Sequence, residues 1–357
     1  MKKLYLTAVL LISLFILSSC AHKDSVPQDT TNTSPNTAVL SVNDFLNDQE
    51  NTRYTYVGQG NEYASFTTNV DYIKGNRVQL RSNNGGTEIV KVIENSNGEL
   101  IQLLARGETY FREDFTQSAL LKSTEGANKG EVLLKEPIAI GTTWTLPDNR
   151  KRTITNIDVS LSNPEGHYKA VEVTTEGNEG KTVDYYGPNV GLIKTVYQSN
   201  GIEVSSMLNK IEKNVPFEQT VRFYYPNVND EKLYYMDKKL SFNTNDITRQ
   251  IFEKEFKNSP QANLGKVLGP NAKINSLYLN KDNRVYIDLN KEFVSEMNAG
   301  SGYEGMILRS LVNTVGGYYG AAKVYLTIEG NPYVSGHIEK KKGEDFSVNI
   351  NNCVGLK

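Results

Sequence analysis

Cysteine is nearly absent from this chain of 357 residues, which contains only Cys20 and Cys353. Two cysteines cannot supply the disulfide framework that holds many small extracellular proteins together. Each folded part must therefore depend on its own apolar core. The length favours two domains. The 21 tyrosines and 28 glycines favour a β-rich protein with many turns.

An excess of positive charge is also missing, because 39 basic residues stand against 41 acidic ones. Proteins that bind nucleic acids neutralise phosphates with lysine and arginine. The balance of charge therefore disfavours nucleic acid as a partner.

Motifs that carry chemistry are scarce. Histidine occurs only at His22, His167 and His337, and the chain has no metal-ligand spacing, nucleophile elbow or dinucleotide fingerprint. We therefore predict no catalytic residues, no metal and no cofactor, and expect a protein that is not an enzyme. Carboxylates that are distant in the sequence could still meet in the fold, so a hydrolase is not excluded.

Several acidic positions have ordinary explanations. The pairs Glu113-Asp114 and Glu344-Asp345 are typical of a solvated surface. Asp282 could bind calcium, but it lies in a predicted turn, and turn chemistry already explains an aspartate there.

The N-terminus has the organisation of an export signal. Lys2-Lys3 precede an apolar stretch, Leu4–Leu17, that is too short for a confident membrane span. The run that ends at Cys20 resembles the lipobox of bacterial lipoprotein precursors. This resemblance implies a signal peptide over residues 1–19, a covalent acyl lipid on Cys20, and anchoring on the extracytoplasmic face of a Gram-positive cell membrane. The alternative is an ordinary secretory signal with an incidental cysteine.

A polar tether and then a β-rich domain follow the signal. Residues 20–44 are mostly polar and predict a flexible linker. Residues 45–214 contain alternating apolar strands joined by turns such as Asn97-Gly98 and Asn200-Gly201, which are strong hairpin signals. We predict a mainly antiparallel sheet that is curved or forms a partly closed barrel. Its single tryptophan, Trp144, is a candidate for stacking on a ligand, although a core or edge plug is the favoured interpretation.

Residues 215–348 predict a second domain of mixed α and β structure, followed by a polar tail over residues 349–357. A helix with apolar residues from Ile247 to Phe256 on one side is expected after the first two strands. Ser301 and Glu304 have the spacing of a capping box, and the apolar stripe that follows predicts a helix ending at Gly316-Gly317. We expect helices on one face of a small mixed sheet.

The motifs in the last third of the chain resemble a known domain. The run LRSLVNTV, the strand KVYLTIEG that follows it, and VYIDLNKEF at Val285–Phe293 occur in the order found in the GerMN domain of sporulation and spore-germination lipoproteins. The resemblance implies a ring-building-like α+β fold that binds envelope or sporulation-complex proteins.

Strand alternation also predicts a tyrosine-rich sheet face. If the aliphatic residues of each strand face the helices, four tyrosines share the opposite face: Tyr224, Tyr278, Tyr286 and Tyr325. A contiguous tyrosine patch often contacts a partner. The alternatives are ordinary cross-strand pairing and docking against the first domain.

Three functions are compatible with the sequence. The first is a lipid-anchored, non-catalytic adaptor in sporulation or germination. The second is an envelope lipoprotein whose β-rich domain binds a glycan, peptide or lipid. The third, for which no motif is found, is an accessory to a cell-wall hydrolase.

Overall fold

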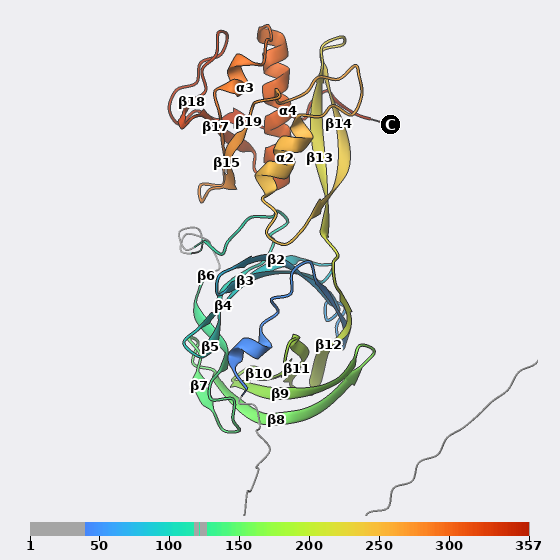
Figure 1. The fold of residues 1–357 in the computed structure, drawn as a ribbon, viewed down its shortest axis with the longest axis vertical. Coiled ribbons are helices and arrows are strands. Elements are labelled where there is room, and N and C mark those ends of the chain that lie inside the picture. The colour runs from blue at the N-terminus through green and yellow to red at the C-terminus, as the bar shows by residue number, and fades with distance from the viewer. Residues whose placement is uncertain (1–39, 118–120, 122–126, 357) are drawn as a thin grey trace, which may run out of the picture. The chain divides into compact units, whose positions relative to one another are not determined.

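Twelve antiparallel strands form one continuous sheet in the N-terminal part of the computed structural model, which describes residues 40–117, 121 and 127–356. The strands are β1 (Arg53–Gln59), β2 (Phe66–Lys74), β3 (Arg77–Asn83), β4 (Glu88–Ser96), β5 (Glu99–Arg106), β6 (Ala127–Lys135), β7 (Thr143–Thr145), β8 (Lys151–Asn163), β9 (Gly166–Gly177), β10 (Gly180–Gly187), β11 (Gly191–Ser199) and β12 (Ile202–Glu212). Figure 1 shows that the sheet curls strongly. Its backbone ladder runs from β6 to β7 without closing, which confirms a curved, mainly antiparallel sheet.

The hairpins follow local turn chemistry. Asn97 and Gly98 have φ angles of 53° and 72° between the paired residues Ser96 and Glu99 of β4 and β5. Both central residues of a tight hairpin turn need positive φ, which asparagine and glycine adopt most readily. Asn200-Gly201 repeats this arrangement between β11 and β12. Both predicted turns are confirmed.

The concave side of this sheet is filled by its own core. A short 3₁₀ helix, η1 (Val42–Phe45), lies inside the curve and contacts β10 and β11. Val42 and Phe45 are each 1% exposed. The packed part of the chain therefore begins before residue 45, where we expected the tether to end, because these two apolar side chains are needed to fill the core.

The C-terminal part contains two small sheets and three helices among the described residues. Its elements are β13 (Phe217–Asn227), β14 (Lys232–Phe242), α2 (Thr248–Phe256), β15 (Ile274–Leu279), β16 (Val285–Leu289), α3 (Glu292–Ser295), α4 (Ser301–Tyr319), β17 (Lys323–Ile328), β18 (Asn331–Pro332), β19 (Phe346–Ser347) and β20 (Cys353–Gly355). One sheet has the order β13-β14-β20 and the other β15-β16-β17-β18, with β19 paired to β17. Both are mixed, because β20 runs parallel to β14 and β17 parallel to β16. The expected α+β arrangement is confirmed.

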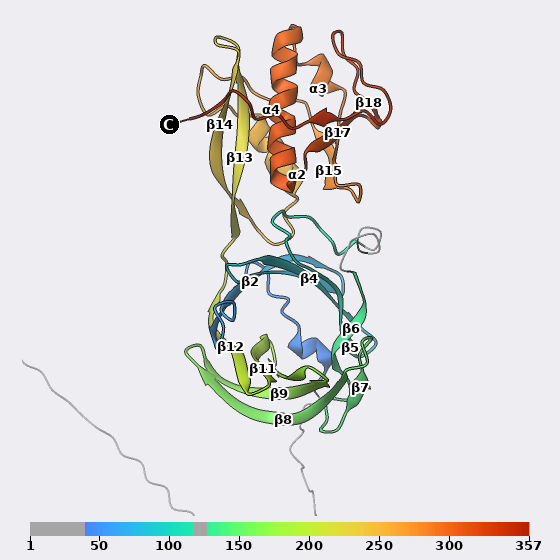
Figure 2. The ribbon, with the colours of Figure 1, turned by 180° about the vertical axis from the view of Figure 1, so that it is seen from behind.

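Helix α4 lies between the β13–β14 hairpin and the sheet of β16 and β17, as both ribbon views show (Figures 1 and 2). We expected the helix to end at Gly316-Gly317, but it continues to Tyr319, and Gly320, with a φ of 67°, is its C-cap. Gly316 instead allows close packing, since a Cβ there would lie 2.3 Å from a methyl carbon of Val348. The glycine at this position therefore permits a close contact with a neighbouring segment and does not end the helix.

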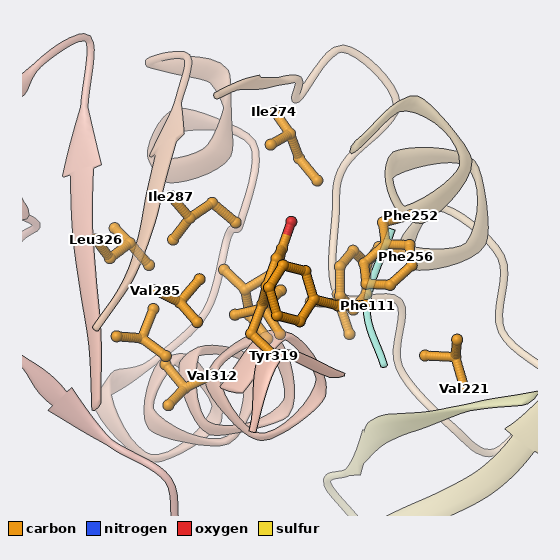
Figure 3. Close-up of a cluster of buried hydrophobic side chains, with 14 of the residues drawn as sticks. Phe111, Val221, Phe252, Phe256, Ile274, Val285, Ile287, Val312, Tyr319 and Leu326 are labelled. Carbon is orange, nitrogen blue, oxygen red and sulfur yellow. The ribbon is translucent and has the colours of Figure 1, made fainter. Parts of the chain in front are cut away.

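A large apolar core surrounds α4. It includes aromatic residues of α2 and aliphatic residues of β15, β16 and β17. Phe111, from the segment after β5, also inserts among them, and its ring centroid lies 4.9 Å from that of Tyr319 (Figure 3). Residues Leu40–Lys357 form one compact unit by their contacts, and the predicted division at residues 214 and 215 stays a prediction. No helix in the described part of the chain is both long and apolar enough to cross a bilayer.

Candidate functional site

Three of the four predicted tyrosines form a row across the sheet of β15, β16 and β17. Tyr278 pairs with Tyr286, and Tyr286 pairs with Tyr325, in the strand register. The ring centroids of Tyr278 and Tyr286 are 5.5 Å apart and stacked, and those of Tyr286 and Tyr325 are 5.1 Å apart. All three side chains are half-buried. We call these three residues the tyrosine row.

Strand alternation explains why the row lies on one face. The neighbours Val285, Ile287 and Leu326 are at most 1% exposed and pack into the core around α4. Successive side chains of a strand point to opposite faces. The tyrosines therefore occupy the face directed away from the helices, as the sequence predicts.

Arg284 lies over this row and is held in place. Its guanidinium carbon is 5.4 Å from the ring centroid of Tyr286 and 5.7 Å from that of Tyr325. Arg284 also forms ion pairs of 2.7 Å with Asp282 and with Asp345. Hydrogen bonds to these carboxylates raise the pKa of Arg284, so its charge is permanent. The turn aspartate that we considered for calcium, Asp282, is thus an arginine partner.

Tyr224 does not join the row. It lies in β13, in the other sheet, where it is 5% exposed and its backbone N–H donates to the hydroxyl of Thr314 in α4. The assumption of a single sheet was wrong, and burial does not alternate in the second half of β13, where every residue from Phe223 to Asn227 is buried. The hairpin of β13 and β14 forms a separate sheet that packs against α4.

Trp144 lies in the core of the curved sheet. Its side chain is 9% exposed, and its indole N–H donates to the carbonyl oxygen of Val132 at 3.0 Å. This bond links β7 to β6, the two edge strands of the sheet. The placement agrees with the plug that we favoured from the sequence, and its role as a ligand contact stays a prediction.

Of the two cysteines, only Cys353 lies among the described residues. Cys20, the predicted lipid attachment residue, and His22 lie outside the described residues. Cys353 is a half-buried free thiol whose sulfur lies 3.6 Å from a guanidinium nitrogen of Arg309. Cys353 begins β20, so the predicted polar tail contributes a strand that pairs with β14.

A cleft of about 1220 Å³ adjoins the tyrosine row, with Tyr278 on its wall. Its other walls come from the end of β2, the segment after β5, and the start of α2. Glu113, which we expected on a solvated surface, lies in this cleft and is only 8% exposed. Burial raises the pKa of Glu113 to about 8, although Arg106 and the backbone N–H of Leu279 act in the opposite direction. The sequence pattern missed this residue, because its burial depends on segments far apart in the chain.

Glu304 lines a second pocket, of about 400 Å³. We expected Glu304 to close a capping box with Ser301, but the N-cap is Gly300, and no side chain caps the helix. Glu304 instead accepts hydrogen bonds from the hydroxyls of Tyr333 at 2.7 Å and Ser335 at 2.5 Å. Its other oxygen accepts a bond of 2.7 Å from Nδ1 of His337.

These bonds fix the loop that follows β18. Burial raises the pKa of the Glu304 carboxyl, but the three donors outweigh it and hold the pKa below its ordinary value. The second ring nitrogen of His337, whose side chain is 42% exposed, is not used in this cluster. Across residues 40–117, 121 and 127–356, no group of three or more histidine, cysteine, aspartate or glutamate side chains could hold a metal ion.

The chain has low overall similarity to several solved structures. No curated protein matches the chain. An exported protein with a YmcC-like fold from Bacteroides fragilis is 13% identical, and the match covers 47% of this chain and 99% of that chain with a TM-score of 0.29. The first GerMN domain of the sporulation protein GerM from Bacillus subtilis is 21% identical, with 36% and 97% covered and a TM-score of 0.28. A protein described as a lipoprotein from Clostridium perfringens is 16% identical, with 37% and 87% covered and a TM-score of 0.25.

The family model named Germane, for sporulation and spore germination, matches residues 222–334. These residues run from β13 to the loop after β18 and contain the tyrosine row and α4. The resemblance expected from the motifs is therefore confirmed: the C-terminal part of this chain is similar to the sporulation and spore germination family.

Proposed function

We propose that this protein is a lipid-anchored, extracytoplasmic adaptor that acts in sporulation or spore germination without catalysing a reaction. The single observation that supports a binding role is the tyrosine row, with Arg284 held across it. Tyrosine and arginine are the residue types that most often dominate protein–protein binding energy. A half-buried aromatic row on a sheet face is suited to a protein partner, because it loses little conformational entropy on binding.

The family match supports the proposed process. Residues 222–334 match a family described by sporulation and spore germination. The lipobox-like run before Cys20 supports export and anchoring, and a protein anchored in this way would meet partners in the cell envelope. In this proposal, the lipid confines the protein to the membrane surface and the tyrosine row binds the partner.

The adaptor role is tested by replacing Tyr278 and Tyr286 together with serine. Site-specific photo-crosslinking at exposed Lys323, beside Tyr325, is followed in intact cells from vegetative growth through sporulation. The crosslinked envelope protein should be strongly reduced in the double variant, while the melting temperature stays close to that of the parent. A double replacement of the exposed Tyr63 and Tyr197 with serine, on the curved sheet, is the matched control and should retain the crosslink. Unfolding of the first variant, or a crosslink that survives in it, contradicts the proposal.

Anchoring is tested separately with Cys20→Ser. The lipid attachment requires the thiol, so the variant should leave the membrane fraction. Membrane retention equal to that of the parent would contradict lipidation at Cys20. The result does not depend on the tyrosine row, so the two parts of the proposal are tested independently.

A further inference from the structure

The cleft beside the tyrosine row has more basic than acidic side chains on its walls. The proposed adaptor role does not explain this excess. Four basic side chains line the cleft, from four different segments: Lys74, Arg106, Arg249 and Lys281. A fifth, Arg112, is buried and lies near the Asp71 carboxylate, 3.6 Å away. The acidic side chains on the wall are Glu113 and Asp114.

The two acidic groups neutralise this charge only in part. Burial raises the pKa of Glu113 to about 8, so at neutral pH its carboxyl is mostly protonated. Asp114 accepts bonds from the backbone N–H and the hydroxyl of Thr116, two residues along the chain. These neutral donors do not remove its charge, so Asp114 offsets one of the four basic side chains. The cleft therefore presents a positive potential to solvent, which attracts anions.

The basic side chains that can contact a ligand differ in exposure and in their neighbours. Lys74 and Lys281 are exposed, at the end of β2 and in the turn between β15 and β16. The Arg106 guanidinium lies over the rings of Phe111 and Phe115, at 5.3 Å and 5.7 Å. The charge of Arg106 acts on the Glu113 carboxyl and lowers its pKa, whereas Lys74 and Lys281 form no ion pair within the described residues. Their spread around a cleft of about 1220 Å³ suits a ligand with repeated negative charge.

The edge of β15 argues against an extended peptide in this cleft. A peptide that added a strand there would need free backbone groups along the edge. The Leu279 N–H lies close enough to the Glu113 carboxyl to lower its pKa, and the Leu277 carbonyl accepts from the Tyr319 hydroxyl at 3.4 Å. Arg249 donates to the carbonyl of Ile274 at 2.9 Å. Side chains therefore cover the edge that a peptide strand would use.

The remaining wall has the chemistry of saccharide recognition. Gln117, Ser276 and Asn283 supply amide and hydroxyl groups, and the ring of Tyr278 supplies an aromatic surface. Hydroxyl-rich sugars are bound by such polar groups beside an aromatic ring. From the charge, the size and the covered edge, we propose that this cleft binds an anionic oligosaccharide, with Lys74, Arg106 and Lys281 as its main charge contacts.

The proposal is tested by calorimetric titration of the full chain at low ionic strength. Hexagalacturonate is the anionic probe, chitohexaose is the neutral probe of equal length, and hexaglutamate is the peptide probe. Hexagalacturonate should bind saturably and more weakly as sodium chloride is added, and chitohexaose should bind at least about tenfold more weakly.

Paired variants locate the binding. The double replacement K74A/K281A removes two exposed cations from the cleft and should weaken hexagalacturonate binding about tenfold. The control K151A/K181A removes the same charge from exposed positions on β8 and β10 and should change binding less than about twofold. Melting temperatures of both variants should equal that of the parent.

Four results would overturn the proposal. These are absence of saturable hexagalacturonate binding, equal losses in the two double variants, chitohexaose binding as tight as that of the anionic probe, and tighter binding of hexaglutamate. The last result would identify a peptide site. Tyr278 belongs to both the cleft and the tyrosine row, but none of these measurements replaces a tyrosine of the row or Cys20, so they can fail while the adaptor proposal stands.

Discussion

The Asp71 carboxylate lies 2.9 Å from the Nε of Arg81, and both side chains are at most 1% exposed. The two residues belong to the adjacent strands β2 and β3. Arg112, also buried, brings its Nε to 3.6 Å from the other oxygen of Asp71. Arg81 has a second acidic partner, Glu88, at 2.9 Å. A single buried carboxylate thus lies between two buried arginines.

Replacing Asp71 with asparagine should destabilise the protein by about 3–5 kcal/mol, because buried Arg112 loses its acidic partner and Arg81 keeps only Glu88. Urea denaturation at pH 7 measures the loss. The control is Asp237→Asn, which removes the acid from a surface pair with Arg222 in which both side chains are 47% exposed. Exposed pairs contribute about 0–1 kcal/mol. Equal losses in the two variants would show that burial does not set the value of the Asp71 pair.

Replacing Glu304 with glutamine should weaken the loop over Tyr333–Ile338 and cost about 1–3 kcal/mol at pH 7. The folded-state pKa of Glu304 is depressed, so its stabilising contribution is present above the ordinary value of 4.5 and is lost as pH falls through the lower, folded value. The difference between parent and variant, measured by denaturation from pH 7 to pH 3, should therefore shrink with acid. Hydrogen exchange should increase in the loop.

The control for this prediction is Glu339→Gln, at an exposed position close to the same loop. It should leave both stability and loop exchange near the parent values. A difference between parent and E304Q that persists unchanged at pH 3 would contradict the assigned role of the charged carboxylate.

Replacing Glu113 with glutamine should have an effect that grows with pH. The folded-state pKa of Glu113 is raised from 4.5 to about 8, so stability is greatest below the unfolded value and is lost as pH rises through about 8. Glutamine cannot ionise, so the variant avoids this loss. Its melting temperature should be near that of the parent at pH 5 and higher at pH 8.5.

Exposed Glu62 supplies the comparison for Glu113. Glu62→Gln should follow the parent across the whole pH range. Parallel curves for parent and E113Q would show that the Glu113 carboxyl is not held in its protonated form by the fold.

Trp144 permits a direct optical test, because it is the single tryptophan of the chain. Its indole is 9% exposed and is hydrogen-bonded inside the curved sheet, so iodide should quench its emission weakly until urea unfolds the protein. Soluble cell-wall fragments should leave the emission maximum unchanged. Strong quenching in the native state, or a spectral shift with wall fragments, would favour the ligand-stacking alternative.

Local chemistry explains which predictions from the sequence succeeded. Asn97-Gly98 predicts a hairpin because two adjacent residues must adopt positive φ. Strand alternation correctly separates Tyr286 from Ile287, because side chains of a strand point to opposite faces. These inferences need only neighbours in the chain.

Non-local contacts explain the failures. Glu304 has the spacing of a capping residue, but its partners come from a loop about thirty residues later, and they outcompete a bond to its own helix end. Glu113 has the composition of a surface pair, but its surroundings come from distant strands and helices. Tyr224 occurs in an alternating sequence pattern, but its burial and the sheet that its strand joins depend on long-range contacts.

The sequence by itself determined the positions of turns, the apolar stripe of α4 and the family resemblance, since each is encoded by residues a few positions apart. The export signal is a prediction of the same local kind. Only the tertiary structure decided which tyrosines meet, which carboxylates are buried and where a positive cleft forms. The physical reason is that burial and charge depend on everything packed around a group, and strand order in a sheet brings together residues that no local pattern relates.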